Sequence, residues 1–422
     1  MHPGDASSIL AWSTKLKHMN ILIIGGGATG SIAAKFLADM ESISKVIIGD
    51  VNEKNVKRFL IPNNKIEFKI LDAKNKNEVL NIAKDCKLII NAASPDFNKT
   101  LMEVALEAGS NYQDLASIWD GATVEQFEYD DKFKEKGLVA LINSSATPGV
   151  SNLVVGELAA NLKQIEYIKI RLLEDVSSDV PITAWSKEVA FDEITAPPYF
   201  WQNDAFVTTD NFSEEEIFDF PEPFINQKCY MIAQEDIGTI PRFIKAKYID
   251  IKAGGSEMEF ARTLLLLGLL KKRAIKVGDV MVSPYQFMVK VWPDVLSIEE
   301  MKKVVESGKI SNAHFWASVE VCGTEAVRIE NLVSKEVVTQ QKKKIVRTHI
   351  LFPDQIEINR NYLGANYVSY AAGLCAAIFA EQIPNLKRKG VYSPEAIEIE
   401  DRPKIFSQLK KFGVKIETIE IK

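Results

Sequence analysis

Cysteine and histidine are scarce in this chain of 422 residues, which has four of each. The cysteines are far apart and none forms a Cys-x-x-Cys pair; they are Cys86, Cys229, Cys322 and Cys375. A zinc site needs clustered ligands and a disulfide framework needs paired cysteines. We therefore expect no metal site, and a reducing compartment, which is the cytoplasm.

Long hydrophobic runs are also missing. The longest, Leu264–Leu270, is far shorter than the roughly 20 apolar residues of a membrane helix. The 51 Lys and Arg residues nearly balance the 57 Asp and Glu residues, which leaves a net charge of −6. This mild acidity argues against nucleic acid or an anionic membrane as the partner. A small molecule is the expected partner.

Regular patterning begins only at Met19. The apolar stretch Ile9–Trp12 is too short for a signal peptide, so we expect residues 1–18 to be a disordered extension. The length of the remaining chain predicts two or three domains.

Strands and helices alternate from residue 19 to residue 147. Apolar runs predict six strands, at Asn20–Ile24, Lys45–Gly49, Lys65–Leu71, Lys87–Asn91, Tyr112–Leu115 and Leu138–Ile142. Helical spacing predicts helices between them, at Ala28–Met40, Glu78–Lys84, Lys99–Ala108 and Val124–Lys136. This alternation predicts an α/β fold, with a doubly wound parallel sheet of the Rossmann type.

The pattern changes after Pro148, and residues 148–361 are expected to form a second, α+β domain. Ile165–Leu173 and Lys245–Ile251 alternate in the way that is typical of a largely antiparallel sheet. The segment between them, Ser177–Gln227, is expected to be irregular. Further strand signals and one capped helix follow, at Glu320–Val321, Arg347–Ile350 and Ser297–Glu306.

Residues 362–422 are expected to pack back on the first domain. Small side chains recur in Tyr367–Ala380, and small residues allow a helix to approach a neighbouring helix closely. The second domain would then interrupt the Rossmann domain in the sequence.

A glycine motif follows the first strand directly and opens the first helix. Gly25, Gly27 and Gly30 match G-x-G-x-x-G, with Ala28 and Thr29 in the first helical turn. Such glycines allow a tight turn, close approach to a pyrophosphate and close helix packing, and the helix N-terminus attracts phosphate. Asp50 ends the second strand, where a carboxylate accepts hydrogen bonds from the adenosine ribose. These features predict a nicotinamide dinucleotide site that prefers NAD, with NADP as the alternative.

Two further segments lie at the carboxyl ends of predicted strands, where ligands of such sheets bind. Asp72 follows the third strand. Contact with the adenine and a position in a solvated loop are equally favoured for its side chain. Small side chains after the fourth strand leave room for the cofactor, with an ordinary strand-to-helix turn as the alternative; they are Asn91, Ala92, Ala93 and Ser94.

Several segments in the same order resemble the saccharopine dehydrogenase-like family, which includes lysine 6-dehydrogenases and carboxynorspermidine synthases. They include Ile23–Gly30, Asn91–Ala93 with Met102–Gly109, Tyr112–Ala116, Pro148–Asn152, Trp185–Glu188, and Ser369–Gly373 with Gly390–Glu395. The resemblance implies an oxidoreductase that acts on a C–N bond of an amino acid or polyamine precursor through an imine. It also implies a homodimer built by the second-domain sheet. Gln234 stands where many relatives resemble His-Pro-Glu, and its amide cannot titrate as an imidazole does.

Imine chemistry needs a proton-transfer group. Asp114, at the end of a strand, and His349 are the candidates. The alternative role for Asp114 is that of a turn carboxylate, and the alternative for His349 is that of a hydrogen-bonded histidine within a strand. Arg171 and Arg242 are candidates for binding a substrate carboxylate, with surface arginines as the alternative. The substrate cleft is expected to be lined by Trp185, Ser186 and Glu193.

Two other functions compete with this dehydrogenase or reductase. One is a non-enzymatic NAD-binding sensor. The other is an enzyme like homospermidine synthase, which retains its NAD without net turnover.

Overall fold

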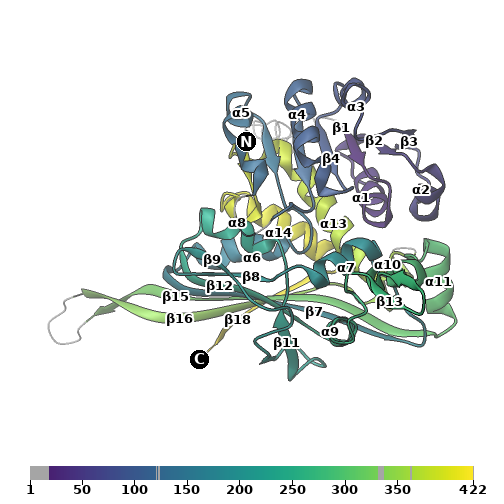
Figure 1. Ribbon diagram of the computed structural model, residues 1–422. Coiled ribbons are helices and arrows are strands. Elements are labelled where there is room, and N and C mark those ends of the chain that lie inside the picture. The colour runs from purple at the N-terminus through teal and green to yellow at the C-terminus, as the bar shows by residue number, and fades with distance from the viewer. Residues whose placement is uncertain (1–18, 120, 122–123, 331–336, 362–363, 422) are drawn as a thin grey trace, which may run out of the picture.

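The computed structural model describes residues 19–421 except 120, 122–123, 331–336 and 362–363, and these residues form two sheets with helices around and between them (Figure 1). The extension expected at residues 1–18 lies outside the described residues. In the part of the chain that is described, no helix is long and apolar enough to cross a membrane.

The first sheet has seven parallel strands in the order β17-β6-β5-β4-β1-β2-β3. Their bounds are β1 Met19–Ile24, β2 Ile43–Asp50, β3 Ile66–Ile70, β4 Leu88–Asn91, β5 Asn111–Asp114, β6 Val139–Leu141 and β17 Gly390–Tyr392. The order of the first six strands is that of a Rossmann sheet, so the predicted fold class is confirmed. Strand β17 was not predicted, because three residues are too few to show a period.

Helices cover both faces of this sheet. They are α1 Ala28–Ala38, α2 Glu53–Phe59, α3 Lys76–Ala83, α4 Asn98–Ala108, α5 Asp130–Glu135 and α13 Tyr367–Gln382. The single helix predicted over Val124–Lys136 is wrong, because Glu125–Tyr129 forms a 3₁₀ turn before α5. In this tighter turn the buried Gln126 amide donates hydrogen bonds to Ser117 Oγ at 2.8 Å and to Asp114 Oδ2 at 3.2 Å.

The second sheet has nine strands, and its main path is β10-β11-β12-β7-β15-β16-β18. These strands are β7 Lys163–Ser178, β10 Glu216–Phe218, β11 Gln227–Met231, β12 Ala246–Gly254, β15 Ile310–Glu330, β16 Val337–Leu351 and β18 Lys415–Ile421. Strands β7 and β12 pair in parallel, although their alternation predicted antiparallel pairing. Alternation shows that one face of a strand is buried and does not fix the direction of its neighbour.

The segment Ser177–Gln227 is more regular than predicted. It contains α7 Lys187–Thr195, β8 Tyr199–Gln202, β9 Ala205–Thr208 and β10. Each of these elements has nine residues or fewer, so the sequence showed little periodicity.

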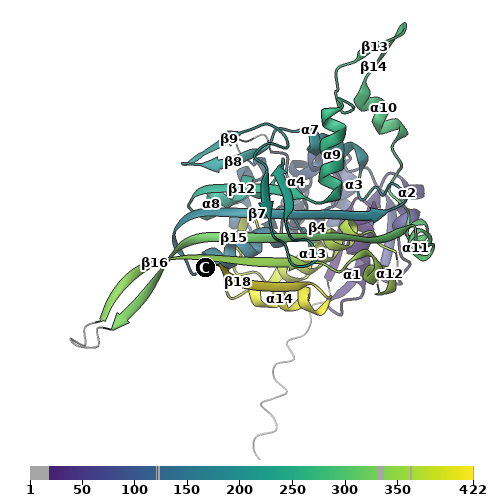
Figure 2. The ribbon, with the colours of Figure 1, turned by 90° about the horizontal axis from the view of Figure 1, so that it is seen from below.

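The other helices of the second domain lie around its sheet. They are α6 Val150–Ala159, α8 Asp236–Phe243, α9 Ser256–Leu266, α10 Pro284–Val291, α11 Ile298–Glu306 and α12 Gln355–Asn361. The predicted cap of α11 is confirmed, since Ser297 and Glu300 form a capping box. A short hairpin projects between α9 and α10, formed by β13 Ile275–Val277 and β14 Val280–Val282 (Figure 2).

The C-terminal segment is divided between the two sheets. Helix α13 and strand β17 join the Rossmann part, whereas β18, which follows α14 Arg402–Lys411, pairs with β16 in the second sheet. The homodimer expected through this sheet stays a prediction.

The two parts of the molecule share one apolar core. A continuous cluster of buried side chains includes Ile23 in β1, Leu374 in α13 and Ile170 in β7. Because α13 contributes to both parts, the nucleotide domain and the second sheet are held together by close packing.

Helices α13 and α1 approach each other closely within this core. A Cβ atom built on Gly373 would lie 2.8 Å from Ile32 Cγ2 and 2.9 Å from the Thr29 carbonyl oxygen. The small residue is therefore required by the neighbouring helix, as the composition of Tyr367–Ala380 predicted.

We predict that Gly373→Val lowers the free energy of unfolding by about 1–3 kcal/mol, because the added atoms overlap α1. Denaturant unfolding followed by circular dichroism measures this change. Ala372→Val, at a half-buried position one residue earlier, is the control and should cost less. An equal loss for both variants would show that the packing against α1 is not the cause.

Candidate nucleotide and substrate site

The turn between β1 and α1 leaves the start of the helix uncapped. Gly27 occupies the N-cap position, and among the described residues no side chain accepts a capping hydrogen bond from the first helical N–H groups. These groups belong to residues such as Ala28 and Thr29, and together with the helix dipole they attract an anion.

The three glycines of the motif meet different neighbours. Gly25 has a φ of +99°, and a Cβ there would lie 2.7 Å from the Ala92 backbone. A Cβ on Gly30 would lie 2.0 Å from the Gly25 carbonyl oxygen. At Gly27 nothing lies within 4 Å of such an atom. Only Gly27 therefore has open space beside it at the uncapped helix start, which fits a dinucleotide pyrophosphate.

Asp50 ends β2 beside this turn. Its Oδ2 accepts a hydrogen bond from Gly26 N at 2.8 Å and its Oδ1 accepts one from Asn52 N at 2.8 Å. The carboxylate thus fixes the glycine turn, and it keeps lone pairs for a ribose at the same sheet edge. Asp72 is exposed at this edge beyond β3, and its Oδ1 accepts a hydrogen bond from Lys74 N.

The turn after β4 is shaped by Asn91. Its amide donates to Asn98 Oδ1 at 2.6 Å and accepts from Ala93 N at 3.0 Å. Ser94 is exposed and caps the short helical turn that follows it. The buried amide of Asn91 therefore holds the turn, while the backbone of Ala92 and Ala93 lies against Gly25.

Asp114 lies at the end of β5 and is fully buried. Its Oδ1 accepts a hydrogen bond from Asn143 N at 2.7 Å, and its Oδ2 accepts the Gln126 amide. Burial raises the pKa of this carboxyl to about 7. The group therefore ties β5 to the segment that follows β6.

The structure does not bring His349 and Arg171 to this edge of the sheet. Their strand neighbours Ile350 and Ile170 face the shared core, so the two side chains point to the opposite face of the second sheet. The Arg171 guanidinium is paired with Asp250 at 2.7 Å and with Glu216 at 2.7 Å.

His349 is engaged on that same outer face. Ser318 Oγ lies 2.7 Å from its Nδ1, and burial lowers the pKa of the imidazole to about 4. Its hydrogen bond thus agrees with the alternative of a structural strand histidine.

Arg242 lies in α8, where its guanidinium covers the Phe127 ring at 4.2 Å from the ring centre. The side chain is exposed at the boundary between the two parts of the molecule. It does not line the pocket that contains the other predicted substrate residues.

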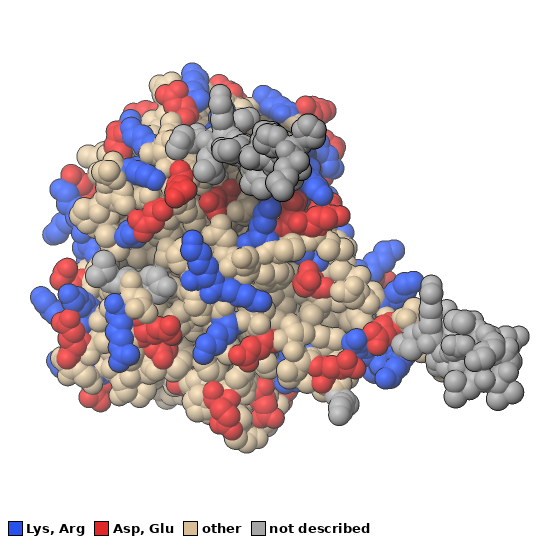
Figure 3. Space-filling view, turned by 180° about the vertical axis from the view of Figure 1, so that it is seen from behind, with Lys and Arg blue, Asp and Glu red and all other residues tan. Residues whose placement is uncertain are grey.

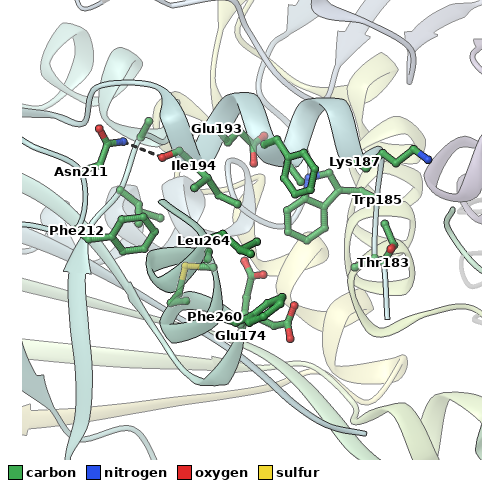
Figure 4. A pocket seen from close by; sticks show the side chains of 18 of the residues that line it. Glu174, Thr183, Trp185, Lys187, Glu193, Ile194, Asn211, Phe212, Phe260 and Leu264 are labelled. Carbon is green, nitrogen blue, oxygen red and sulfur yellow. Dashed lines mark hydrogen bonds between the residues drawn. The ribbon is translucent and has the colours of Figure 1, made fainter. Parts of the chain in front are cut away.

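Trp185 and Glu193 line a pocket in the second domain (Figure 4). Ser186 begins α7 as its N-cap, accepting a hydrogen bond from Val189 N, so its hydroxyl has a structural role. Figure 4 shows Glu193 on one side of the pocket and Glu174 on the opposite side.

The pocket wall is attached to the nucleotide domain. Asn366 Nδ2 donates a hydrogen bond to the Ala184 carbonyl oxygen at 2.8 Å. The same residue caps α13, the helix that packs on α1, and it lines a small cavity together with Ala28. Asn366 therefore links the pocket wall to the helix that packs on α1.

Carboxyl groups dominate the polar lining of the pocket, and the sequence reasoning missed most of them. Besides Glu193, they are Glu174 in β7 and Glu257 in the first turn of α9, with Glu235 close to Glu193. Burial raises the pKa of Glu174 to about 8, and that of Glu235 and Glu257 to about 7 each. Burial and the Glu235 carboxylate raise the pKa of Glu193 well above its usual range.

Among the described residues that line the pocket, Lys187 is the one basic side chain. Its Nζ is bound to Asp294 Oδ1 at 2.7 Å and to the Trp292 carbonyl oxygen at 3.1 Å. In Figure 4 it points away from the acidic groups. The pocket is thus suited to a cationic ligand.

Comparisons with known proteins agree with the predicted resemblance. Residues 21–141 match the family model of the saccharopine dehydrogenase NADP binding domain. The chain is 24% identical to carboxyaminopropylagmatine dehydrogenase of Synechocystis sp., over 66% of this chain and 74% of that one. It is 25% identical to carboxynorspermidine synthase of Vibrio cholerae, with the same coverage.

The fold is shared with a solved structure. Saccharopine dehydrogenase (L-Glu forming) of Saccharomyces cerevisiae aligns with a TM-score of 0.67 and 12% identity, over 96% of this chain and 100% of that one. The predicted resemblance to the saccharopine dehydrogenase-like oxidoreductases is confirmed.

We predict that Gly27→Ala weakens dinucleotide binding by at least about tenfold without lowering the melting temperature. The methyl group would occupy the open space at the helix start, which a pyrophosphate needs. Isothermal titration and thermal unfolding measure the two quantities. Gly26→Ala is the control, because its Cβ would lie 2.5 Å from Val56 Cγ2 and should mainly destabilise the fold. Unchanged affinity in Gly27→Ala would place the phosphates elsewhere.

Proposed function

We propose that this chain is an NAD(P)-dependent oxidoreductase that transfers a hydride at a C–N bond of an amine through an imine. The similarity to saccharopine dehydrogenase-like proteins supports the reaction type. The observation that carries the proposal is an acidic pocket whose wall is held by Asn366, the cap of the helix that packs on the uncapped Rossmann helix α1.

The reaction balances as imine, reduced nicotinamide and one proton giving amine and oxidised nicotinamide. A bound dinucleotide would supply or accept the hydride. The protein has three tasks: to hold the dinucleotide at the glycine turn, to orient the substrate nitrogen, and to supply the proton.

Glu193 is our candidate for the proton. It lies in α7, which runs between the second sheet and the nucleotide domain (Figure 1). Because burial and the neighbouring Glu235 raise its pKa well above the usual range, the protonated form of this carboxyl is favoured, and this form suits donation to an imine nitrogen. Trp185 and Phe212 shield the same space from water (Figure 4).

We assign Asp114 a positioning role in place of direct proton transfer. Both of its carboxylate oxygens already accept hydrogen bonds, and the side chain is fully buried. It holds the segment that follows β6 at the carboxyl end of the sheet, where the nicotinamide of a Rossmann protein lies.

We favour a polyamine precursor over an amino acid as the substrate. Two of the relatives carry names of polyamine-type products, and the pocket offers carboxyl groups without a free cation for an amino-acid carboxylate. Charges of both signs are interspersed on the face seen in Figure 3, without a single basic band. This distribution supports a small-molecule partner.

The purified chain should oxidise reduced nicotinamide when an amine and an aldehyde are supplied together, as followed by the absorbance of the reduced cofactor. Tight cofactor binding without turnover on a panel of amines, aldehydes and 2-oxo acids would favour a sensor. Cofactor that copurifies in stoichiometric amount without net turnover would favour an enzyme like homospermidine synthase.

In this assay Glu193→Gln should lower turnover about 10²-fold, because the amide cannot donate the proton. Cofactor affinity should stay unchanged. Glu188→Gln, an exposed position on the same helix, is the matched control and should retain full turnover. Equal turnover in the wild type and in Glu193→Gln would remove Glu193 from the proton path.

We further propose that NAD is preferred over NADP by about tenfold or more, since the Asp50 carboxylate would repel a 2′-phosphate. Isothermal titration with both cofactors measures the preference. Asp50→Ser combined with Val51→Arg should narrow or invert it, because the arginine would pair with the phosphate. Tighter NADP binding by the wild type would show that Asp50 does not face the ribose.

A further inference from the structure

Glu174 is a buried carboxylate without a partner. Its side chain is only 7% exposed and lines the pocket, yet no hydrogen bond or ion pair reaches its oxygens from the described residues. A buried charge without a partner costs several kcal/mol, so such groups are normally paired. A partner for Glu174 is therefore expected to come from a ligand.

The backbone fixes the position of Glu174 beside Glu257. Strand β7 contacts the start of α9, where Ser256 N donates to Asp175 Oδ1 and Val176 N donates to Ser256 Oγ. A Cβ on Gly255 would lie 2.3 Å from the Glu174 carbonyl oxygen, which keeps the two elements in close contact. As a result Glu257, in the first turn of α9, raises the pKa of Glu174 by charge repulsion in addition to burial.

The groups that face this pair are acidic or neutral. Asp175 and Tyr367 lie near it from β7 and α13, and Glu193 lies across the pocket. His314 lies on the far side of Asp175, and burial lowers its pKa below the usual range. Lys187 is engaged by Asp294. No basic group in the described part of the pocket therefore neutralises Glu174 and Glu257.

The rest of the pocket suits an alkyl chain. Apolar side chains make up much of the lining, including Met258, Phe260 and Leu264. Figure 4 shows Glu193 and Glu174 on opposite sides of the pocket, with Leu264 between them and Phe260 beside Glu174.

We propose that Glu174 and Glu257 bind the distal ammonium of a linear di- or polyamine and thereby select substrates with two or more ammonium groups. This assignment rests on the proposed function, since it takes the reacting nitrogen to lie at the Glu193 wall, toward the nucleotide domain. The alkyl chain then spans the apolar middle of the pocket. An amino acid would place its carboxylate against these acids and would be rejected.

The test measures binding to the full chain by isothermal titration, with putrescine and butylamine as probes. Both have the same alkyl chain, but only putrescine has a second ammonium. The wild type should bind putrescine at least about tenfold more tightly. Glu174→Gln should abolish this difference and leave butylamine unaffected. Glu259→Gln is the control, since Glu259 lies on the exposed side of α9, where it accepts a hydrogen bond from Tyr230.

A pH series adds a second readout. An ammonium favours the ionised carboxylates, so putrescine affinity should rise with pH up to about 8, the value to which burial raises the pKa of Glu174. The dependence should weaken in Glu174→Gln. The melting temperature of this variant should not fall, since Glu174 makes no hydrogen bond or ion pair with the described residues; a lower melting temperature with an unchanged binding ratio would assign Glu174 a structural role.

Equal wild-type affinity for the two probes, or a ratio that survives Glu174→Gln, would overturn the assignment. Putrescine selectivity without hydride transfer would support the site and contradict the proposed function. Hydride transfer with amino acids alone, without diamine selectivity, would support the proposed oxidoreductase reaction and contradict the diamine site.

Discussion

The contact between α1 and α13 is the constraint on which the site depends. Gly373 lets the two helices approach until their backbones are nearly in van der Waals contact. The N-terminus of α13 then lies beside the glycine turn, and its cap residue Asn366 holds the pocket wall at Ala184. Bulkier side chains at this contact would move the glycine turn away from the pocket wall. The relative position of these two features therefore depends on the absence of a Cβ atom at Gly373.

A second constraint is electrostatic. Several carboxyl groups share a space from which water is largely removed, and each disfavours ionisation of the others. Apolar residues at these positions would cost less free energy to bury than the carboxyl groups do. Burial and mutual repulsion raise the pKa values of these carboxyls and so favour their protonated forms, whereas a bound cation would favour their ionised forms. The same feature makes the pocket a poor site for an anionic ligand.

The nucleotide half could be predicted from the sequence, because its signals are local. The glycine motif and the alternating elements each depend on residues a few positions apart, and the same holds for the Ser297–Glu300 box in the second domain. The pocket could not be predicted in this way. Arg171 and His349 have suitable chemistry, but alternation does not reveal which face of a strand meets the site. Glu174 lies one residue beyond the strand predicted at Ile165–Leu173, and only the three-dimensional fold brings Glu257 beside it.

Strand β17 and helix α13 complete the nucleotide domain from a distant part of the sequence. During synthesis, residues 19–147 leave the ribosome before these elements are made. Until then the first sheet has an unpaired edge at β6, and one face of α1 is uncovered. The second domain, which is continuous except for β18, has most of its contacts available earlier. The order of folding should thus run against the order of synthesis, with the inserted domain forming first and the Rossmann sheet closing last.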